Sequence, residues 1–329
     1  MKTILVTGGA GFIGSHFIKM ILDKRPEYKV INIDNLTYAG DLSNLPQAPN
    51  DRYRFYKVDI CDKIGLERVF SKHPIDCVIN FAAESHVDRS IQSPEVFIKT
   101  NVLGTQTLLE VARIHWSQNW IQGDTSDLQY KEGVKFVQIS TDEVYGSTTP
   151  DCKFTELSPL CPSSPYSASK AGADLIVFAY SKTYNMPINI TRCGNNYGPN
   201  QHVEKLIPLV IQRALSDEEI PIYGDGLQMR DWVYVEDHCL GILKVLEEGK
   251  IGSTYNISGG DILKNVDVAE HILKILQTSK SKVVHIEDRK GHDYCYALDC
   301  SKITNELGWQ RQVDFEDGLV KTIKWYKGE

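Results

Sequence analysis

The sequence contains no hydrophobic run that approaches the roughly 20 residues of a membrane-spanning helix. It also has no excess of basic residues, since 36 Lys and Arg stand against 43 Asp and Glu, for a net charge of −7. An acidic chain has little general attraction for nucleic acids or anionic membranes. We therefore expect neither as a partner, and local arginines and lysines would have to bind any anionic ligand.

Cysteine pairs and histidine clusters of the metal-binding kind are missing as well. None of the eight cysteines forms a CxxC pair, and none of the nine histidines lies in an HExxH segment. No secretory segment precedes the first apolar stretch, so we expect reduced thiols in a cytoplasmic protein and no metal site. The 329 residues suffice for one large or two modest domains.

The first clear motif follows a predicted strand at residues 2–7. Segment 8–14 reads GGAGFIG, apolar residues at helical spacing come next, and a second strand at residues 29–33 ends at Asp34. Glycines in such a turn let backbone N–H groups approach a pyrophosphate at a helix N-terminus. Asp34 can accept hydrogen bonds from an adenosine ribose and would repel a 2′-phosphate. The spacing therefore predicts an NAD site rather than a merely flexible turn.

Strands and helices alternate along the first half of the chain. Further strands are predicted at residues 53–58 and 77–81, and a further helix opens at Asn101. This order predicts a parallel, doubly wound α/β sheet with right-handed crossovers. The polar stretch His115–Gly133 interrupts the pattern, and we interpret it as a surface excursion.

Polar groups that follow these strands are candidates for ligand binding. Loop 36–40 can close over the adenosine, and Asp59 can lie beside adenine, although a solvated surface position is the alternative. Glu84, Ser85 and His86 follow the strand at 77–81 and can hydrogen-bond a polyol. His86 can instead be a structural group.

Residues suited to proton transfer follow another predicted strand. The apolar run 134–139 ends at Ser140, so Thr141, Asp142 and Glu143 are expected where a strand ends and a loop begins. This is a usual place for chemistry in α/β sheets.

Tyr166 and Lys170 form a second candidate pair. They lie four residues apart in a predicted helix, which places the phenol and the ammonium group on one face. A free tyrosine has a pKa of about 10, and a neighbouring cation favours the phenolate. Tyr166 is then expected to accept a proton from a hydroxyl group. The alternative is a chance pair on a helix surface.

Four segments together carry a family resemblance. They read FAAESHVDRS at 81–90, STDEVYG at 140–146, NNYGP at 195–199 and RDW at 230–232, and the Tyr/Lys pair completes the set. Over nearly its whole length the chain resembles the nucleotide-sugar 4,6-dehydratases of the extended short-chain dehydrogenase/reductase family. The adjacent Asp and Glu are the discriminating feature, because simple epimerases of the same superfamily usually lack them.

The resemblance implies a Rossmann fold with a smaller C-terminal substrate-binding domain. The NAD-binding domain is expected over residues 1–193, with 232–258 returning to it. Residues 194–329 are expected to bind mainly the nucleotide sugar, since their loops carry Asn, Lys, Tyr and Arg. The helices near Asn101 and Tyr166 have more apolar residues than one core face needs, and the family usually dimerises through this pair. We therefore expect a homodimer.

The resemblance also implies a reaction. Tyr166 takes the proton of the sugar's carbon 4 hydroxyl while a hydride passes to NAD, assisted by Thr141 and Lys170. Glu143 then removes the carbon 5 proton, and protonated Asp142 donates to the departing carbon 6 oxygen, which requires opposite protonation states. The hydride returns to carbon 6, so the product is a 4-keto-6-deoxy sugar and no NAD is consumed.

Two sets of binding residues follow from the resemblance. For NAD they are Gly8, Gly11, Phe12, Ile13, Gly14, Asp34, Asn35, Asp59, Ile60, Ala82, Ala83, Ser85, Asn101, Tyr166 and Lys170. For the nucleotide sugar they are Glu84, Ser85, His86, Asn195, Asn196, Lys205, Leu206, Tyr223, Arg230, Asn256, Arg289 and His292.

The expected substrate is dTDP-glucose. UDP-glucose and UDP-N-acetylglucosamine remain alternatives, because Asn200 and Lys290 stand where these enzymes often carry an aromatic residue and a proline. A nucleotide-sugar epimerase and a regulator that binds NAD without catalysis are further alternatives. The complete set of five catalytic candidates argues against the regulator.

Overall fold

The computed structural model describes residues 2–45, 51–121, 128–277 and 281–329. Within these residues seven parallel strands form one sheet in the order β3-β2-β1-β4-β5-β6-β10. They are β1 (Lys2–Thr7), β2 (Tyr28–Asp34), β3 (Tyr53–Lys57), β4 (Cys77–Asn80), β5 (Lys135–Thr141), β6 (Ile188–Cys193) and β10 (Thr254–Ile257). The predicted parallel α/β sheet is confirmed. Its order reverses between β1 and β4, the position at which such sheets bind ligands.

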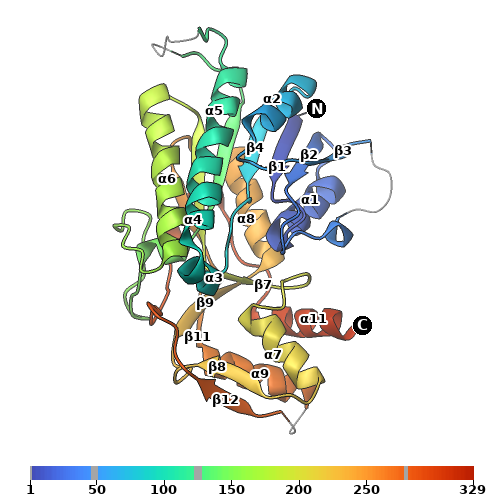
Figure 1. The fold of residues 1–329 in the computed structure, drawn as a ribbon, viewed down its shortest axis with the longest axis vertical. Coiled ribbons are helices and arrows are strands. Elements are labelled where there is room, and N and C mark those ends of the chain that lie inside the picture. The colour runs from blue at the N-terminus through green and yellow to red at the C-terminus, as the bar shows by residue number, and fades with distance from the viewer. Residues whose placement is uncertain (1, 46–50, 122–127, 278–280) are drawn as a thin grey trace.

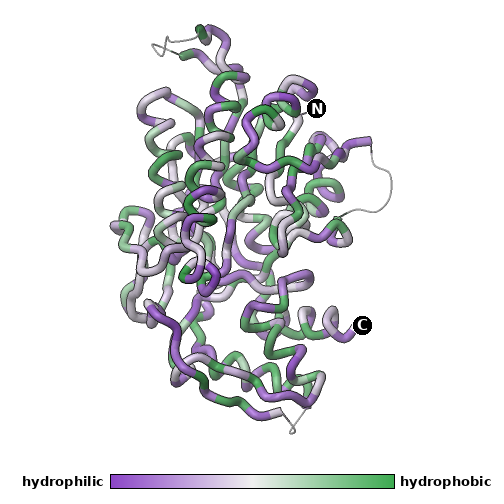
Figure 2. Tube along the Cα trace, viewed as in Figure 1, coloured by the Kyte–Doolittle hydropathy of each residue, from purple (hydrophilic) through white to green (hydrophobic). Residues whose placement is uncertain are grey.

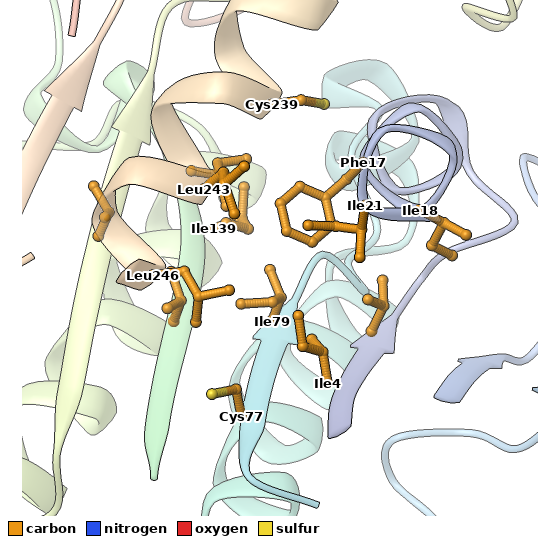
Figure 3. Close-up of a cluster of buried hydrophobic side chains, with 14 of the residues drawn as sticks. Ile4, Phe17, Ile18, Ile21, Cys77, Ile79, Ile139, Cys239, Leu243 and Leu246 are labelled. Carbon is orange, nitrogen blue, oxygen red and sulfur yellow. The ribbon is translucent and has the colours of Figure 1, made fainter. Parts of the chain in front are cut away.

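Helices cover both faces of this sheet (Figure 1). On one face lie α1 (Phe12–Lys24), α8 (Val235–Glu248) and α10 (Ser301–Leu307), and on the other α2 (Lys63–Lys72), α5 (Thr105–Trp116) and α6 (Pro165–Tyr184). Because side chains alternate along a strand, Ile4 of β1 packs with α1 and α8, whereas Leu5 packs with α2 and α5. Figure 3 shows Phe17 of α1 facing Leu243 of α8. Burial of a side chain of this size contributes about 1.5–3 kcal/mol.

The rest of the chain forms a smaller body with its own core. It contains β7 (Asn195–Tyr197), β8 (Ile220–Tyr223), β9 (Met229–Tyr234), β11 (Asp261–Lys264), β12 (Val283–Ile286), α7 (Leu206–Leu215), α9 (Asn265–Leu276) and α11 (Phe315–Lys327). β9 pairs with β7 and β11, and β8 pairs with β12. In Figure 2 hydrophobic and hydrophilic positions alternate along its helices, as expected for elements with one buried face.

The chain crosses between the two bodies repeatedly. After β9 it enters α8 and β10 of the large sheet, and it then returns to the smaller body for β11, α9 and β12. It crosses once more for α10, because Ile303, Leu307 and Trp309 pack in the core shared by α1 and α8. The sequence did not indicate this last crossing, since a helix of seven residues has too few apolar positions to show its partner.

The helix predicted to open at Asn101 begins earlier. Two short helices, α3 (Val87–Gln92) and α4 (Pro94–Phe97), precede a π-helical stretch at Ile98–Gly104, which leads into α5. Pro94 in the first turn of α4 is a usual helix-start signal. The π-helical stretch places Asn101 in the interior, where it is 1% exposed.

The predicted surface excursion at His115–Gly133 starts too early, because its first residues belong to α5. Trp116 is the last residue of α5 and is buried, with its indole N–H donating to the Ile75 carbonyl at 2.8 Å. A buried indole needs such a partner. The excursion therefore begins at Ser117, and its residues 122–127 lie outside the described residues.

Two kinds of feature do not occur among the described residues. No helix there has both the length and the apolar character that a membrane crossing requires. No group of three or more His, Cys, Asp and Glu side chains there is placed to hold a metal ion.

The turn after β1 gives a prediction about stability. Gly8 has φ +66°, and a Cβ there would lie 2.7 Å from the backbone N of Ala82. Gly308 has φ +63° and no atom near its Cβ position. We expect Gly308→Ala to lower the free energy of unfolding by about 1–2 kcal/mol, the strain of a left-handed alanine. Gly8→Ala should lower it further because the backbone of Ala82 must also move. Equal losses in urea unfolding would contradict this.

Candidate active site

The turn between β1 and α1 has the form of a pyrophosphate cradle. Gly8 packs directly against the end of β4, and a Cβ at Gly14 would lie 2.5 Å from the Gly8 carbonyl. Gly11 is the N-cap of α1 and contributes no side-chain cap, so the first N–H groups of the helix can bind an anion. The expected residues Phe12 and Ile13 belong to this first turn. The residues present therefore fit a dinucleotide.

Asp34 ends β2 beside this turn. Its two carboxylate oxygens accept hydrogen bonds from the N–H groups of Ala10 at 2.9 Å and Leu36 at 2.8 Å. Burial raises its pKa, and these two N–H groups oppose the rise. Each oxygen can accept one more hydrogen bond, which suits ribose hydroxyls. Asn35 donates to Asp59 at 3.0 Å, so two expected adenosine residues are adjacent.

The other expected cofactor residues lie around the end of β4. Ala82, Ala83 and Ser85 follow the strand and are partly exposed, whereas Ile60 is buried. The Asn101 amide is fully engaged: its oxygen accepts from the Glu84 N–H at 2.8 Å, and its nitrogen donates to the Glu84 carbonyl and to Ser169. Asn101 therefore fixes the loop after β4 and the start of α6.

The carboxyl pair lies at the end of β5, as expected, but in a single 3-10 turn (Asp142–Tyr145) rather than an open loop. The Thr141 hydroxyl donates to Asp142 Oδ1 at 3.1 Å and accepts from the Glu143 N–H at 3.3 Å. Asp142 is 2% exposed, and its Oδ2 has no hydrogen-bond partner among the described residues. Asp142 Oδ2 is thus a buried polar atom that the described residues leave unsatisfied.

The surroundings separate the two carboxyl groups in protonation. Burial, and then the charge of Glu143, raise the pKa of Asp142 well above its usual value. Burial also raises the pKa of Glu143, but the cations Arg230, Lys205 and Arg289 oppose that rise. When two carboxyl groups share a buried site, only one can easily ionise. Burial therefore favours the protonated form of both carboxyl groups, and the three cations favour the charged form of Glu143.

Tyr166 and Lys170 both lie on α6 and are 8% and 4% exposed, so the pair is not on the helix surface. The Lys170 ammonium group donates to the Ile139 carbonyl at 2.6 Å. Burial, and then the charge of Glu143, raise the pKa of Tyr166 well above its usual value, while Thr141 opposes the rise by hydrogen bonding. Desolvation is therefore the largest influence on Tyr166 in the protein alone, and the expectation that Lys170 favours the phenolate stays a prediction.

Part of the expected nucleotide-sugar set lines the opposite side of the site. Lys205 donates to the Ser85 carbonyl at 2.9 Å, so the segment before α7 contacts the loop after β4. His86 Nδ1 accepts from the Arg89 N–H and caps α3, which supports the structural alternative for this residue. Its other ring nitrogen lies 3.6 Å from Glu204.

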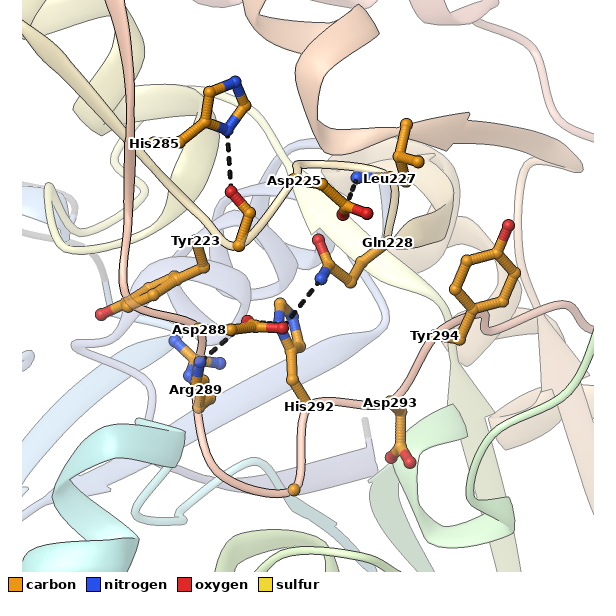
Figure 4. A network of polar contacts seen from close by, with 12 residues as sticks. Tyr223, Asp225, Leu227, Gln228, His285, Asp288, Arg289, His292, Asp293 and Tyr294 are labelled. Carbon is orange, nitrogen blue, oxygen red and sulfur yellow. Dashed lines mark hydrogen bonds and ion pairs between the residues drawn. The ribbon is translucent and has the colours of Figure 1, made fainter.

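A polar network at the end of β8 contains three more of the expected residues (Figure 4). Arg289 binds Asp88 through two nitrogens, at 2.6 and 2.9 Å, and lies 4.9 Å over the Tyr223 ring. The Tyr223 hydroxyl donates to the same carboxylate, and His292 pairs with Asp288 at 2.7 Å. Asp88 was missed as a site residue, although it stands inside the FAAESHVDRS motif.

Arg230 lies on β9 and Asn196 on β7, and the charge of Arg230 acts on both carboxyl groups. Arg230 donates to the Met229 and Asp293 carbonyls and stacks 4.4 Å from the Tyr296 ring centre. The Asn196 oxygen is 2.8 Å from Nδ1 of His238, a fully buried residue that the sequence analysis did not select. Asn195 precedes Asn196 in β7, and Leu206 begins α7.

Asn256 lies apart from the other residues that were expected to bind the nucleotide sugar. Its side chain is 0% exposed, with its oxygen accepting from Tyr145 and its nitrogen donating to the Phe154 and Asp299 carbonyls. The Tyr145 hydroxyl also accepts from Arg192, which pairs with buried Asp174 at 2.9 Å. Asn256 is thus part of an internal network beneath the site.

The chain is similar to known proteins over nearly its whole length. The family profile described as GDP-mannose 4,6 dehydratase matches residues 5–322. A dTDP-glucose 4,6-dehydratase of Haemophilus influenzae is 49% identical over 99% of this chain and 98% of that protein. The crystal structure of DesIV, a dTDP-glucose 4,6-dehydratase of Streptomyces venezuelae with NAD and TYD bound, has a TM-score of 0.91 at 47% identity, covering 99% and 97% of the two chains. That of Bacillus anthracis dTDP-glucose 4,6-dehydratase with NAD has a TM-score of 0.88 at 44% identity, covering 100% and 97%.

The raised pKa of Asp142 predicts that this residue lowers the free energy of unfolding at high pH. A carboxyl group whose folded pKa exceeds its unfolded value of about 3.9 loses its stabilising effect as pH rises through the folded pKa. Asn cannot ionise, so Asp142→Asn should be about 1–2 kcal/mol more stable than the wild type at pH 8, and less different at pH 5. Asp151→Asn, at an exposed position, is the control. Urea unfolding that shows the same pH dependence in all three proteins would refute the assignment.

Proposed function

Because the chain belongs to the GDP-mannose 4,6 dehydratase family, we propose that it is an NAD-dependent dehydratase of dTDP-glucose. It oxidises carbon 4, eliminates water across carbons 5 and 6 and returns the hydride to carbon 6. The observation that carries the chemistry is the carboxyl pair, in which buried Asp142 keeps a proton and Glu143 is surrounded by cations. An epimerase does not need such a pair. A regulator without catalysis needs none of the five catalytic candidates, which are Thr141, Asp142, Glu143, Tyr166 and Lys170.

The elimination follows from these two residues. A sugar's carbon 5 proton is too weakly acidic to remove until a ketone stands at carbon 4. Glu143 is then the base for that proton, because nearby cations keep it charged. Asp142 donates its proton through Oδ2, the oxygen without a partner among the described residues, to the carbon 6 oxygen as it leaves. The two roles require opposite protonation states in adjacent residues, which the burial of Asp142 provides.

The oxidation uses the pair on α6. Tyr166 takes the carbon 4 hydroxyl proton, with Thr141 beside it and the buried ammonium group of Lys170 on the same helix face. Gly8, Gly11, Gly14 and Asp34 would hold NAD, which would supply the hydride chemistry and, on its nicotinamide ring, a positive charge. Burial raises the pKa of Tyr166 in the protein alone, and a positive charge near the phenol would oppose that rise.

The nucleotide contacts come from the smaller body. Lys205, Arg230 and Arg289 are the cations that face the carboxyl pair, and they suit a diphosphate. The same contacts serve any nucleotide sugar, and one methyl group separates thymine from uracil. A pocket discriminates a methyl group by only about 1–3 kcal/mol. The substrate therefore has to be tested directly.

The proposed function predicts a substrate order. In deuterated water the enzyme should convert dTDP-glucose to a 4-keto-6-deoxy sugar, which is detected by its absorbance in alkali. The product should carry solvent deuterium at carbon 5. The kcat/KM for dTDP-glucose should exceed the kcat/KM for UDP-glucose and that for UDP-N-acetylglucosamine. A preference of more than tenfold for either UDP sugar would overturn the substrate assignment.

Glu143→Gln is the matched control for the mechanism. It keeps the shape of the side chain and removes the base, so carbon 4 should still be oxidised while carbon 5 takes up no deuterium. Normal turnover in this variant would contradict the dehydratase mechanism.

The apolar surface formed by α4, the π-helical stretch and α6 supports a homodimer. Val96, Ile98, Leu103 and Leu175 are between 43% and 58% exposed on these neighbouring helices. A second copy that packs its own pair of helices here would bury them. The free thiols at all eight cysteines support the expected cytoplasmic location.

Leu175→Glu tests this interface. A charge at its centre should shift sedimentation at micromolar concentration from dimer to monomer, because burying an unpaired carboxylate is unfavourable. Ile286→Glu, a similar change on β12 at a residue 40% exposed, should leave the dimer intact. A monomeric wild type, or a dimeric Leu175→Glu variant, would disprove the proposed interface.

A further inference from the structure

Residues 199–205, in the connection between β7 and α7, are attached to α1 and to two loops at the carboxyl edge of the large sheet. The Pro199 carbonyl accepts from His16 Nε2 on α1 at 2.9 Å. Glu204 accepts from Tyr38, after β2, at 3.2 Å, and Lys205 donates to the Ser85 carbonyl, after β4, at 2.9 Å. The three attachment points follow β1, β2 and β4, the strands next to which the expected cofactor residues lie. We call residues 199–205 the crossing segment.

Tyr38 also contacts two further side chains. The Arg89 guanidinium group lies 3.6 Å from the centre of its ring, and the His202 ring meets its edge at 5.5 Å. Burial, and then the charges of Glu204 and Glu84, raise the pKa of Tyr38, so its hydroxyl remains a donor. Glu204 is only 16% exposed, which strengthens a hydrogen bond to its carboxylate.

Tyr38 and Glu204 join the two ligand regions of the protein. Tyr38 belongs to the loop that begins directly after Asp34, whose carboxylate is placed for the ribose of NAD. Glu204 directly precedes Lys205 and Leu206, which are expected to bind the nucleotide sugar. A contact between these loops must therefore break or move if either ligand region opens.

We propose that Tyr38 and Glu204 form a clasp that retains NAD through the whole catalytic cycle and tightens when the nucleotide of the substrate is bound. The proposal rests on the proposed function for its second part. The reaction stores a hydride between two steps, so losing the cofactor between them would leave the sugar oxidised and the enzyme unable to finish. The clasp makes cofactor release depend on the substrate segment.

The test is the rate at which the diluted holoenzyme loses NAD, measured by rapid desalting of samples and chromatography of the NAD that stays with the protein. Tyr38→Phe keeps the ring and removes only the hydroxyl, so loss should accelerate about tenfold or more. Glu204→Gln should accelerate it too, and the double variant should lose NAD no faster than the more affected single variant. Tyr28→Phe is the matched control, because its hydroxyl contacts Glu247 at 3.4 Å on the opposite edge of the sheet.

Coupling is tested by adding dTDP. It should slow NAD loss from the wild type and from Tyr28→Phe, and have little effect on Tyr38→Phe. Loss from Tyr38→Phe at the rate of the control would overturn the clasp. Faster loss that dTDP slows as strongly as in the wild type would overturn the coupling. The comparison without dTDP needs no turnover, so it separates failure of the clasp from failure of the proposed function.

Discussion

Removal of water from Asp142 is the constraint on which the rest of the site depends. A solvated carboxyl group at neutral pH is ionised, and an ionised Asp142 could not donate a proton. The fold buries this residue at the end of a central strand and places Glu143 beside it, so that only one negative charge is tolerated. The smaller body then supplies cations that oppose the rise in the pKa of Glu143. The two bodies are therefore both necessary for one pair of protonation states.

The support beneath the site is equally demanding. Arg192 and Asp174 pair in the interior at 2.9 Å, and Tyr145 links Arg192 to Asn256. Loss of one partner of such a pair typically destabilises a protein by about 3–5 kcal/mol, because it leaves a charge uncompensated. The network connects α6, β6, β10 and the 3-10 turn that carries the carboxyl pair. It explains why Asn256, expected at the substrate, has no polar atom left for it.

Patterns that are local in the sequence predicted most of the fold and the chemistry. The glycine turn, the acid at the end of the second strand and the Tyr/Lys spacing each lie within a short stretch, so each can be recognised without the rest of the chain. Contacts between distant residues could not be predicted in this way. Asp88 meets Arg289 and Tyr38 meets Glu204 only after the two bodies have come together. The dominant effect of burial on the Tyr166 pKa could not be predicted for the same reason, since helical spacing shows a neighbouring cation but not the degree of burial.

The repeated crossing of the chain between the two bodies has a consequence for biosynthesis. β6 leaves the ribosome long before β10, its neighbour in the large sheet, because β7, α7, β8, β9 and α8 are made in between. Until β10 arrives, β6 presents an open edge of unpaired backbone groups, which is a template for association with another chain. The loop with Arg289 and His292 is made later still. Nascent chains that end before β10 are therefore the form of this protein most exposed to aggregation, and its synthesis rate in that interval matters to its yield.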